Sequence, residues 1–302
     1  LGKLNAVRDI FKAEYHSLGN NLRQLVLTDF IRKDFQIHLG DNSAQFTQLG
    51  VLSYFESIRR EIIEQSWTVP VAVLTGSLVI IPTSAKEHLE RLIPNSRLSY
   101  DVIGQLSQED YLKVSVSGSH HDLVTALTQL FQEGHIQVII GTKSLLGEGW
   151  DAPCVNSLIL ASFVGSLMLS NQMRGRAIRV WPDNPNKTSN IWHLVSINLS
   201  PRRWFDFQDE KEKYDETLEL QLYALSPDLD LLDRRMTQFL GLHYQEPTIE
   251  SGIDRLDLNQ ITFSRKGLEK LNQNAITLSQ KRQELKDRWQ QALPLYEEME
   301  VV

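Results

Sequence analysis

The stretch IQVIIGTKSLLGEGWDAP, Ile136–Pro153, joins an apolar run to a loop rich in glycine. The residues from Ile136 to Ile140 are mostly β-branched, which is typical of a buried strand. Glycines after such a strand allow backbone amide groups to approach a ligand closely. In open α/β sheets, ligands bind beyond the carboxyl ends of the strands. The stretch therefore predicts a buried strand that ends in a candidate binding loop.

Strand-like and helix-like segments alternate on both sides of this stretch. Apolar runs typical of buried strands lie at 25–27, 78–81, 113–116, 158–161 and 191–195. Apolar residues at helical spacing lie at 4–18, 49–63, 85–92, 123–131 and 166–180. Such alternation implies crossover connections and a parallel sheet with helices on both faces. We predict an α/β domain over residues 46–200, followed by a charged, mostly helical C-terminal extension over 201–302.

Composition and charge exclude several classes of protein. The 302 residues are 41% hydrophobic and 23% charged, as in ordinary globular proteins, and the formal net charge is −7. That charge argues against a chain that coats nucleic acid by charge alone, so any contact with nucleic acid must be local. The single cysteine, Cys154, excludes a disulfide framework and favours a reducing, cytoplasmic location. No membrane segment is expected, because no apolar run reaches the ~20 residues of a spanning helix.

A second motif, QMRGRAIR, follows at Gln172–Arg179. On a helix, Gln172, Arg176 and Arg179 have the spacing i, i+4, i+7 and share one stripe. Guanidinium groups present fixed donor forks that match phosphate oxygens, so this stripe suits a polyanion. Two surface arginines that form ion pairs with nearby carboxylates are the alternative.

The two motifs together resemble motifs V and VI of superfamily 2 helicases and translocases of the DEAD/DEAH type. The shared pattern is a strand, Gly-Thr-x6-Gly-x-Asp, a strand, and Gln-x-x-Gly-Arg-x-x-Arg. The resemblance implies a RecA-like fold of the P-loop NTPase type, the second of two such domains that enclose ATP. It implies that Arg179 is an arginine finger, with Arg176 as a second phosphate ligand and Gln172 as an accessory contact. Gly149 and Asp151 would contact the nucleotide, and Thr142 a nucleic-acid phosphate.

Weaker matches extend this resemblance. Leu78–Ser84 resembles motif IV, in which Thr83 and Ser84 would hold a nucleic-acid phosphate, although helix capping also explains Ser84. Leu25–Asp29 lies where motif III would lie. Residues 1–45 would then be the tail of the first RecA-like domain, and 46–200 the second, helicase C-terminal domain. The chain begins Leu-Gly-Lys rather than with Met, and we expect a piece of a longer protein.

Two motifs of the family are missing from the sequence. A phosphate-binding Gly-x4-Gly-Lys-[Ser/Thr] loop is absent, and so is an Asp-Glu-x-[Asp/His] box that could hold Mg²⁺. The resemblance therefore implies an ATP hydrolase in which ATP and Mg²⁺ bind to the full-length protein, while this part alone binds neither and is inactive. The expected partners are the N-terminal RecA-like domain of the same parent chain and nucleic acid. The sequence Gly-Glu-Gly-Trp-Asp-Ala-Pro at 147–153 resembles motif V of helicases of restriction and repair systems more than that of RNA-unwinding DEAD-box proteins. This resemblance favours DNA over RNA.

Other readings stay open at this point. A non-catalytic RecA-like module that binds nucleic acid or protein is the main alternative, and a sugar-nucleotide-binding α/β domain is a third. No metal site is predicted, because His120 and His121 are adjacent at a helix start, where their side chains diverge. Trp150 either stacks on a base or packs under its own loop. Cys154 is expected to be a small buried hydrophobe.

Overall fold

The computed structural model describes residues 2–143, 150–162, 167–197, 226–243, 246, 248–252, 254–256, 264–292 and 294. The chain divides into two compact units, Leu1–Leu194 and Val195–Val302. The strands of the first unit are β1 (Gln24–Thr28), β2 (Val71–Leu74), β3 (Val79–Pro82), β4 (Leu98–Asp101), β5 (Tyr111–Val116), β6 (Val138–Thr142), β7 (Ser157–Leu160) and β8 (Asn190–His193). Its helices are α1 (Gly2–Leu18), α2 (Val51–Glu64), α3 (Lys86–Leu92), α4 (His120–Glu133) and α5 (Leu167–Ala177).

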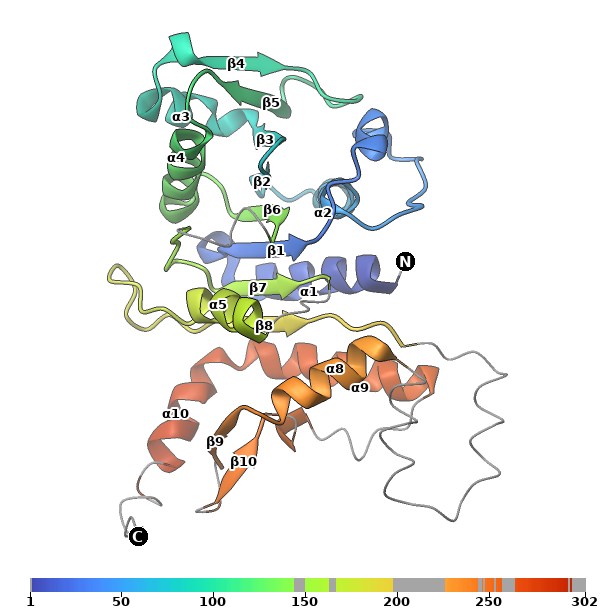
Figure 1. Ribbon diagram of the computed structural model, residues 1–302, viewed down its shortest axis with the longest axis vertical. Coiled ribbons are helices and arrows are strands. Elements are labelled where there is room, and N and C mark those ends of the chain that lie inside the picture. The colour runs from blue at the N-terminus through green and yellow to red at the C-terminus, as the bar shows by residue number, and fades with distance from the viewer. Residues whose placement is uncertain are drawn as a thin grey trace. The chain divides into compact units, whose positions relative to one another are not determined.

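These strands form one mixed sheet in the order β4-β5-β3-β2-β6-β1-β7-β8 (Figure 1). Strands β2, β6, β1, β7 and β8 are parallel to one another, whereas β3, β5 and β4 form an antiparallel edge. The turn from β2 to β3 spans only residues 75–78, which is too short for a crossover and forces the antiparallel pairing. The predicted α/β class is confirmed, with an antiparallel edge that the sequence analysis did not predict.

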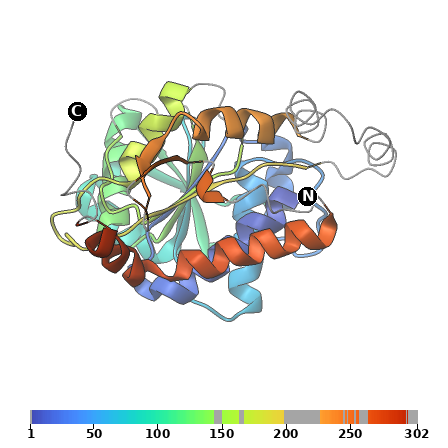
Figure 2. The same ribbon diagram turned by 90° about the horizontal axis from the view of Figure 1, so that it is seen from below.

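Helices cover both faces of the sheet, and each face has its own apolar core. Leu25 and Leu27 of β1 join a buried cluster with α3, α4 and α5. Val26, between them, joins the cluster of α1 and α2 on the opposite face. This alternation follows from the two-residue period of a strand. Figure 2 shows the strands between the two groups of helices.

Strand β1 lies inside this sheet, although residues 1–45 were predicted to belong to a preceding domain. Its register places Leu25 opposite Ile139 of β6 on one side and opposite Leu158 of β7 on the other. Helix α1 packs against α2 of the same unit. Residues 1–45 are therefore part of the first unit and not the tail of a separate domain, because β1 is one of its central buried strands.

Local features of the sequence account for several element boundaries. Helix α1 ends at Leu18, as the predicted segment 4–18 does, and a 3₁₀ turn, Gly19–Asn21, follows it. Ser119 caps α4 by accepting a hydrogen bond from the His121 amide at 3.2 Å. Ser84 does not act as a cap, because a 3₁₀ turn, Thr83–Ala85, precedes α3 and neither element has a side-chain cap. Further 3₁₀ turns lie at Lys33–His38 and Asn95–Arg97.

The second unit contains helices α8 (Pro227–Met236), α9 (Arg265–Gln280) and α10 (Arg282–Ala292). Strands β9 (Leu240–Leu242) and β10 (Ile249–Ser251) pair antiparallel, and a 3₁₀ turn follows at Asp254–Leu256. Helices α9 and α10 lie within residues 201–302, which were predicted to be mostly helical. Arg202, Arg203 and Trp204, which form a basic-aromatic cluster in the sequence, lie outside the described residues. None of the described helices combines the length and apolar character that crossing a membrane requires.

Candidate functional site

The carboxyl ends of the parallel strands bring two threonines together. Thr28 ends β1 and Thr142 ends β6, and the register pairs them directly. Both side chains are buried. Thr142 was predicted to contact a nucleic-acid phosphate, whereas Thr28 was assigned to another domain. The sheet order makes Thr28 its neighbour, and strand order cannot be read from one sequence.

The residues that follow these threonines form an ion pair. Lys143 Nζ lies 2.5 Å from Asp29 Oδ1, and the Lys143 side chain is only 9% exposed, against 36% for Asp29. The Lys143 amide also donates to the Thr28 carbonyl at 3.1 Å. The first residue after β6 is therefore fixed to β1 through both its backbone and its side chain. Sequence reasoning missed this pair because the two residues are far apart in the chain.

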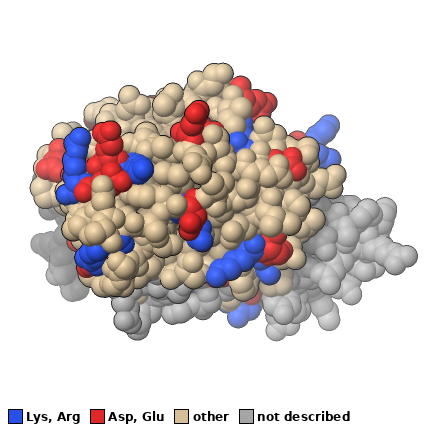
Figure 3. Space-filling view, turned by 90° about the horizontal axis from the view of Figure 1, so that it is seen from above, with Lys and Arg blue, Asp and Glu red and all other residues tan. Residues whose placement is uncertain are grey.

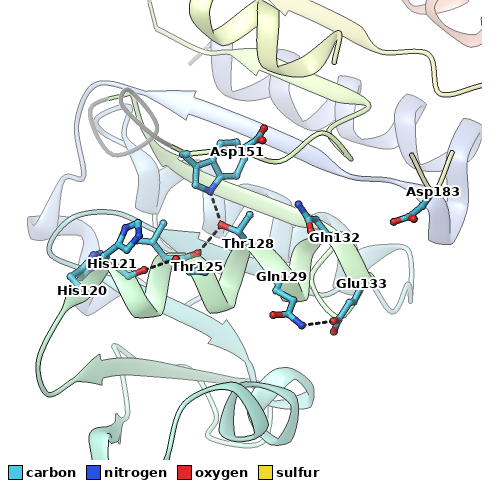
Figure 4. A pocket seen from close by; sticks show the side chains of 11 residues that line it. His120, His121, Thr125, Thr128, Gln129, Gln132, Glu133, Asp151 and Asp183 are labelled. Carbon is cyan, nitrogen blue, oxygen red and sulfur yellow. Dashed lines mark hydrogen bonds between the residues drawn. The ribbon is translucent and has the colours of Figure 1, made fainter. Parts of the chain in front are cut away.

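Trp150 packs under the segment that carries Asp151. Its ring is buried, and its Nε1 donates to Thr128 Oγ1 of α4 at 2.7 Å. Thr128 in turn donates to the Val124 carbonyl at 2.7 Å (Figure 4). Of the two readings of Trp150, packing is the one observed. The buried indole fixes the segment to α4, while the Asp151 side chain is 59% exposed.

Helix α5 brings the predicted arginines to the Asp151 segment. Arg179, just beyond the helix end, donates through Nη1 to Asp151 Oδ1. Arg176 Nη1 donates to the Trp150 carbonyl at 2.5 Å. Burial and the neighbouring Arg179 lower the pKa of Arg176, while Asp151 opposes this shift. Gln172, one turn before Arg176, is exposed. The structure thus brings together Asp151, Arg176 and Arg179 from the two motifs.

The predicted motif IV residues, Thr83 and Ser84, lie at the opposite ends of the strands from Thr142. Strand β3 runs antiparallel to β2, and β2 is parallel to β6. The carboxyl end of β3 therefore lies at the amino ends of these parallel strands, away from Thr142 at the carboxyl end of β6. Thr83 Oγ1 donates to the Gln108 carbonyl at 2.7 Å. Thr83 and Ser84 therefore do not join the group of Thr142. The short turn after β2 was the signal that could have revealed this reversal.

Gly149, the remaining predicted nucleotide contact, lies outside the described residues, as do Gly147 and Glu148. Among the residues that the structure does describe, no group of three His, Cys, Asp or Glu side chains could hold a metal ion. Cys154 is buried, and burial raises the pKa of its thiol to about 12. This matches the expectation of an inert, hydrophobic cysteine.

A groove of 860 Å³ runs along the outer face of α4 next to Asp151 (Figure 4). Glu133, Asp151 and Asp183 supply its acidic groups, and no Lys or Arg is among the described residues that line it. An acidic lining does not suit a polyanion. On the face seen in Figure 3, basic and acidic side chains are interspersed over the described surface. A local site, not a broad basic field, must account for any nucleic-acid contact there.

Comparisons with known proteins identify no family for this chain. No family model matches the sequence, and no curated protein matches it either. The chain is similar to a solved structure described as the C-terminal part of the Fun30 ATPase domain, with 16% sequence identity and a TM-score of 0.36. The similarity covers 78% of this chain and 53% of the other. The chain thus spans about half the length of that structure.

Proposed function

We propose that this chain is the C-terminal part of an ATP-dependent superfamily 2 helicase or translocase, with its first unit as the second RecA-like domain. The observation that supports this most directly is the meeting of Asp151 with Arg176 and Arg179. These residues come from two motifs that the family uses together. They lie on the face of the sheet that α4 and α5 cover, where Trp150 and Met173 join one buried cluster.

In this proposal, ATP and Mg²⁺ bind to the N-terminal RecA-like domain of the same parent chain. When the two domains close, Arg179 leaves Asp151 and reaches the γ-phosphate, where its positive charge stabilises the transition state. Arg176 binds a second phosphate oxygen, and Gln172 makes an accessory contact. Asp151 orients Arg179 before closure, and Asp151 and Gly149 contact the nucleotide after it. This part alone is inactive, because it lacks the phosphate-binding loop.

Nucleic acid, with DNA favoured over RNA, is the proposed second partner. Thr142 contacts a backbone phosphate. Thr28 lies beside Thr142, at the carboxyl end of the neighbouring strand. Thr83 and Ser84 remain candidates for a separate phosphate contact at the opposite ends of the strands. The net charge of −7 supports a short contact region and a salt-dependent affinity.

The deciding experiment is nucleic-acid-stimulated ATP hydrolysis by the full-length parent protein. Wild type is compared with Arg179→Ala and with the control Arg91→Ala, whose exposed side chain lies on α3. We expect Arg179→Ala to reduce turnover by ~10³ or more while ATP affinity stays near normal, and Arg91→Ala to leave both unchanged. Unchanged turnover in Arg179→Ala, or no ATP hydrolysis by wild type, would support the non-catalytic binding module instead.

A further inference from the structure

Lys187 links the two segments that carry the candidate catalytic groups. Its Nζ donates to the Ala177 carbonyl at 2.6 Å and to the Val155 carbonyl at 2.7 Å. Ala177 is the last residue of α5, next to Arg176. Val155 belongs to the segment that begins with Trp150 and Asp151. One ammonium group therefore joins the end of the arginine helix to the Asp151 segment.

Ser189 reinforces the same link. Its Oγ lies 2.6 Å from the Ala177 carbonyl and 3.0 Å from the Val155 carbonyl. Lys187 Nζ also lies 3.2 Å from Ser189 Oγ. Two side chains from the connection into β8 thus converge on the same pair of carbonyl oxygens.

The chemistry of this contact suits a cation. The last carbonyls of an α-helix have no partner within the helix and carry the negative end of its dipole. A lysine near a helix C-terminus satisfies such carbonyls by hydrogen bonding. Lys187 does this at Ala177 while it also holds Val155, so the contact restrains the position of one segment relative to the other.

We propose that Lys187 is a positioning residue that holds the end of α5, and with it Arg179, in register with the Asp151 segment. The inference rests on the proposed function, because it concerns the placement of the proposed finger. Arg176 and Arg179 themselves bridge the two segments in this structure, and both must turn toward phosphate oxygens in the closed state. Lys187 and Ser189 keep the segments joined after these arginines turn away.

Misplacement of a catalytic group by about 1 Å can cost ~10²-fold in rate. Replacing Lys187 with methionine keeps a similar stem but removes the ammonium group. We therefore expect Lys187→Met to lower kcat by about 10–100-fold in the full-length protein. KM for ATP and ATP affinity should stay within about twofold, because Lys187 does not contact the nucleotide in this proposal.

A double-mutant cycle separates positioning from a general structural role. Wild type, Lys187→Met, Arg179→Ala and the double variant are compared in the full-length protein by kcat, KM and thermal unfolding. Lys86→Met, on α3 with a partly exposed side chain, is the control. If Lys187 acts through Arg179, the substitution at Lys187 should have no further effect on kcat once Arg179 is alanine. The control should leave kcat unchanged.

An equal loss of kcat from Lys187→Met in both backgrounds, or no loss beside wild-type Arg179, would overturn the inference. An unchanged rate in Arg179→Ala alone would instead overturn the proposed function, so the two failures are distinguishable. If Lys187→Met does not fold, Ser189→Ala replaces it in the cycle. It should lower kcat by a smaller factor, and again only when Arg179 is present.

Discussion

Arg179 donates to the carboxylate of Asp151 across a separation of 28 residues in the sequence. The two side chains are 50% and 59% exposed. Exposed ion pairs contribute only about 0–1 kcal/mol to folding, since water screens them and two side chains lose freedom. This pair therefore orients the two groups more than it stabilises the fold.

Asp151→Ala should lower the ATP turnover of the full-length protein while leaving stability nearly intact. The expected change in the free energy of unfolding is below about 1 kcal/mol, because the pair is exposed. Urea unfolding of wild type and variant measures it. A loss above about 2 kcal/mol would show that Asp151 has a structural role, contrary to this interpretation.

The sequence predicted the individual strands and helices in the centre of the fold better than it predicted the order of the strands in the sheet. Strands β6 and β7 and helix α5 were predicted because long apolar runs and helical spacing are local signals. The neighbours of β1 were not, since any buried strand that ends in Thr-Asp has the same local pattern. The antiparallel edge was missed because only the short turn at 75–78 indicates it, and Thr83 and Ser84 were grouped with Thr142 for the same reason.

In the candidate site, too, local motifs could be found from the sequence, whereas contacts between distant segments could not. Arg176, Arg179 and Asp151 could be chosen from their motifs, and the structure brings them together. Asp29, Lys143 and Lys187 could not be chosen, because their roles depend on contacts between distant segments. A lysine in a loop has no sequence signal that distinguishes a solvated side chain from one that holds two carbonyls.

Removing Asp29 should destabilise the protein more than removing Lys143. Asp29→Asn removes the carboxylate charge that faces the nearly buried Lys143 ammonium, whereas Lys143→Met leaves a carboxylate that water can reach. Breaking a fully buried pair costs ~3–5 kcal/mol, and partial exposure of Asp29 reduces this to about 1–3 kcal/mol for Asp29→Asn. Chemical unfolding of both variants provides the comparison. Equal losses, or a larger loss for Lys143→Met, would contradict the asymmetry.

Gly104→Ala should be among the more damaging small substitutions in the first unit. Gly104 has φ +61°, and an added Cβ would lie 2.5 Å from the Gln36 carbonyl oxygen, a backbone atom that cannot rotate away. The positive φ costs about 1–2 kcal/mol and overpacking about 1–3 kcal/mol, so a loss of roughly 2–5 kcal/mol is expected.

Gly76→Ala is the matched control for this substitution. Nothing lies within 4 Å of its added Cβ. Its free energy of unfolding should change by no more than about 0.5 kcal/mol. The argument fails if the variants at Gly104 and Gly76 unfold at the same denaturant concentration.

His135 should make folding stability sensitive to mild acid. Its ring stacks on that of His88, with centroids 3.4 Å apart. Burial, followed by the charge of His88, lowers the pKa of His135, while Glu133 opposes the shift and Arg91 and Arg23 add to it. The folded state therefore binds this proton less tightly than the unfolded chain does. His135 therefore contributes favourably to the free energy of unfolding above the unfolded pKa of about 6.5, and this contribution is lost as the pH falls below that value.

The test is urea unfolding between pH 7.5 and 5 for wild type and His135→Gln. Glutamine cannot gain a proton, so the variant should lose less stability than wild type over this range. His121→Gln, on the exposed start of α4, controls for the general effect of removing a histidine. Parallel pH profiles for wild type and His135→Gln would mean that His135 binds its proton equally in the folded and unfolded states.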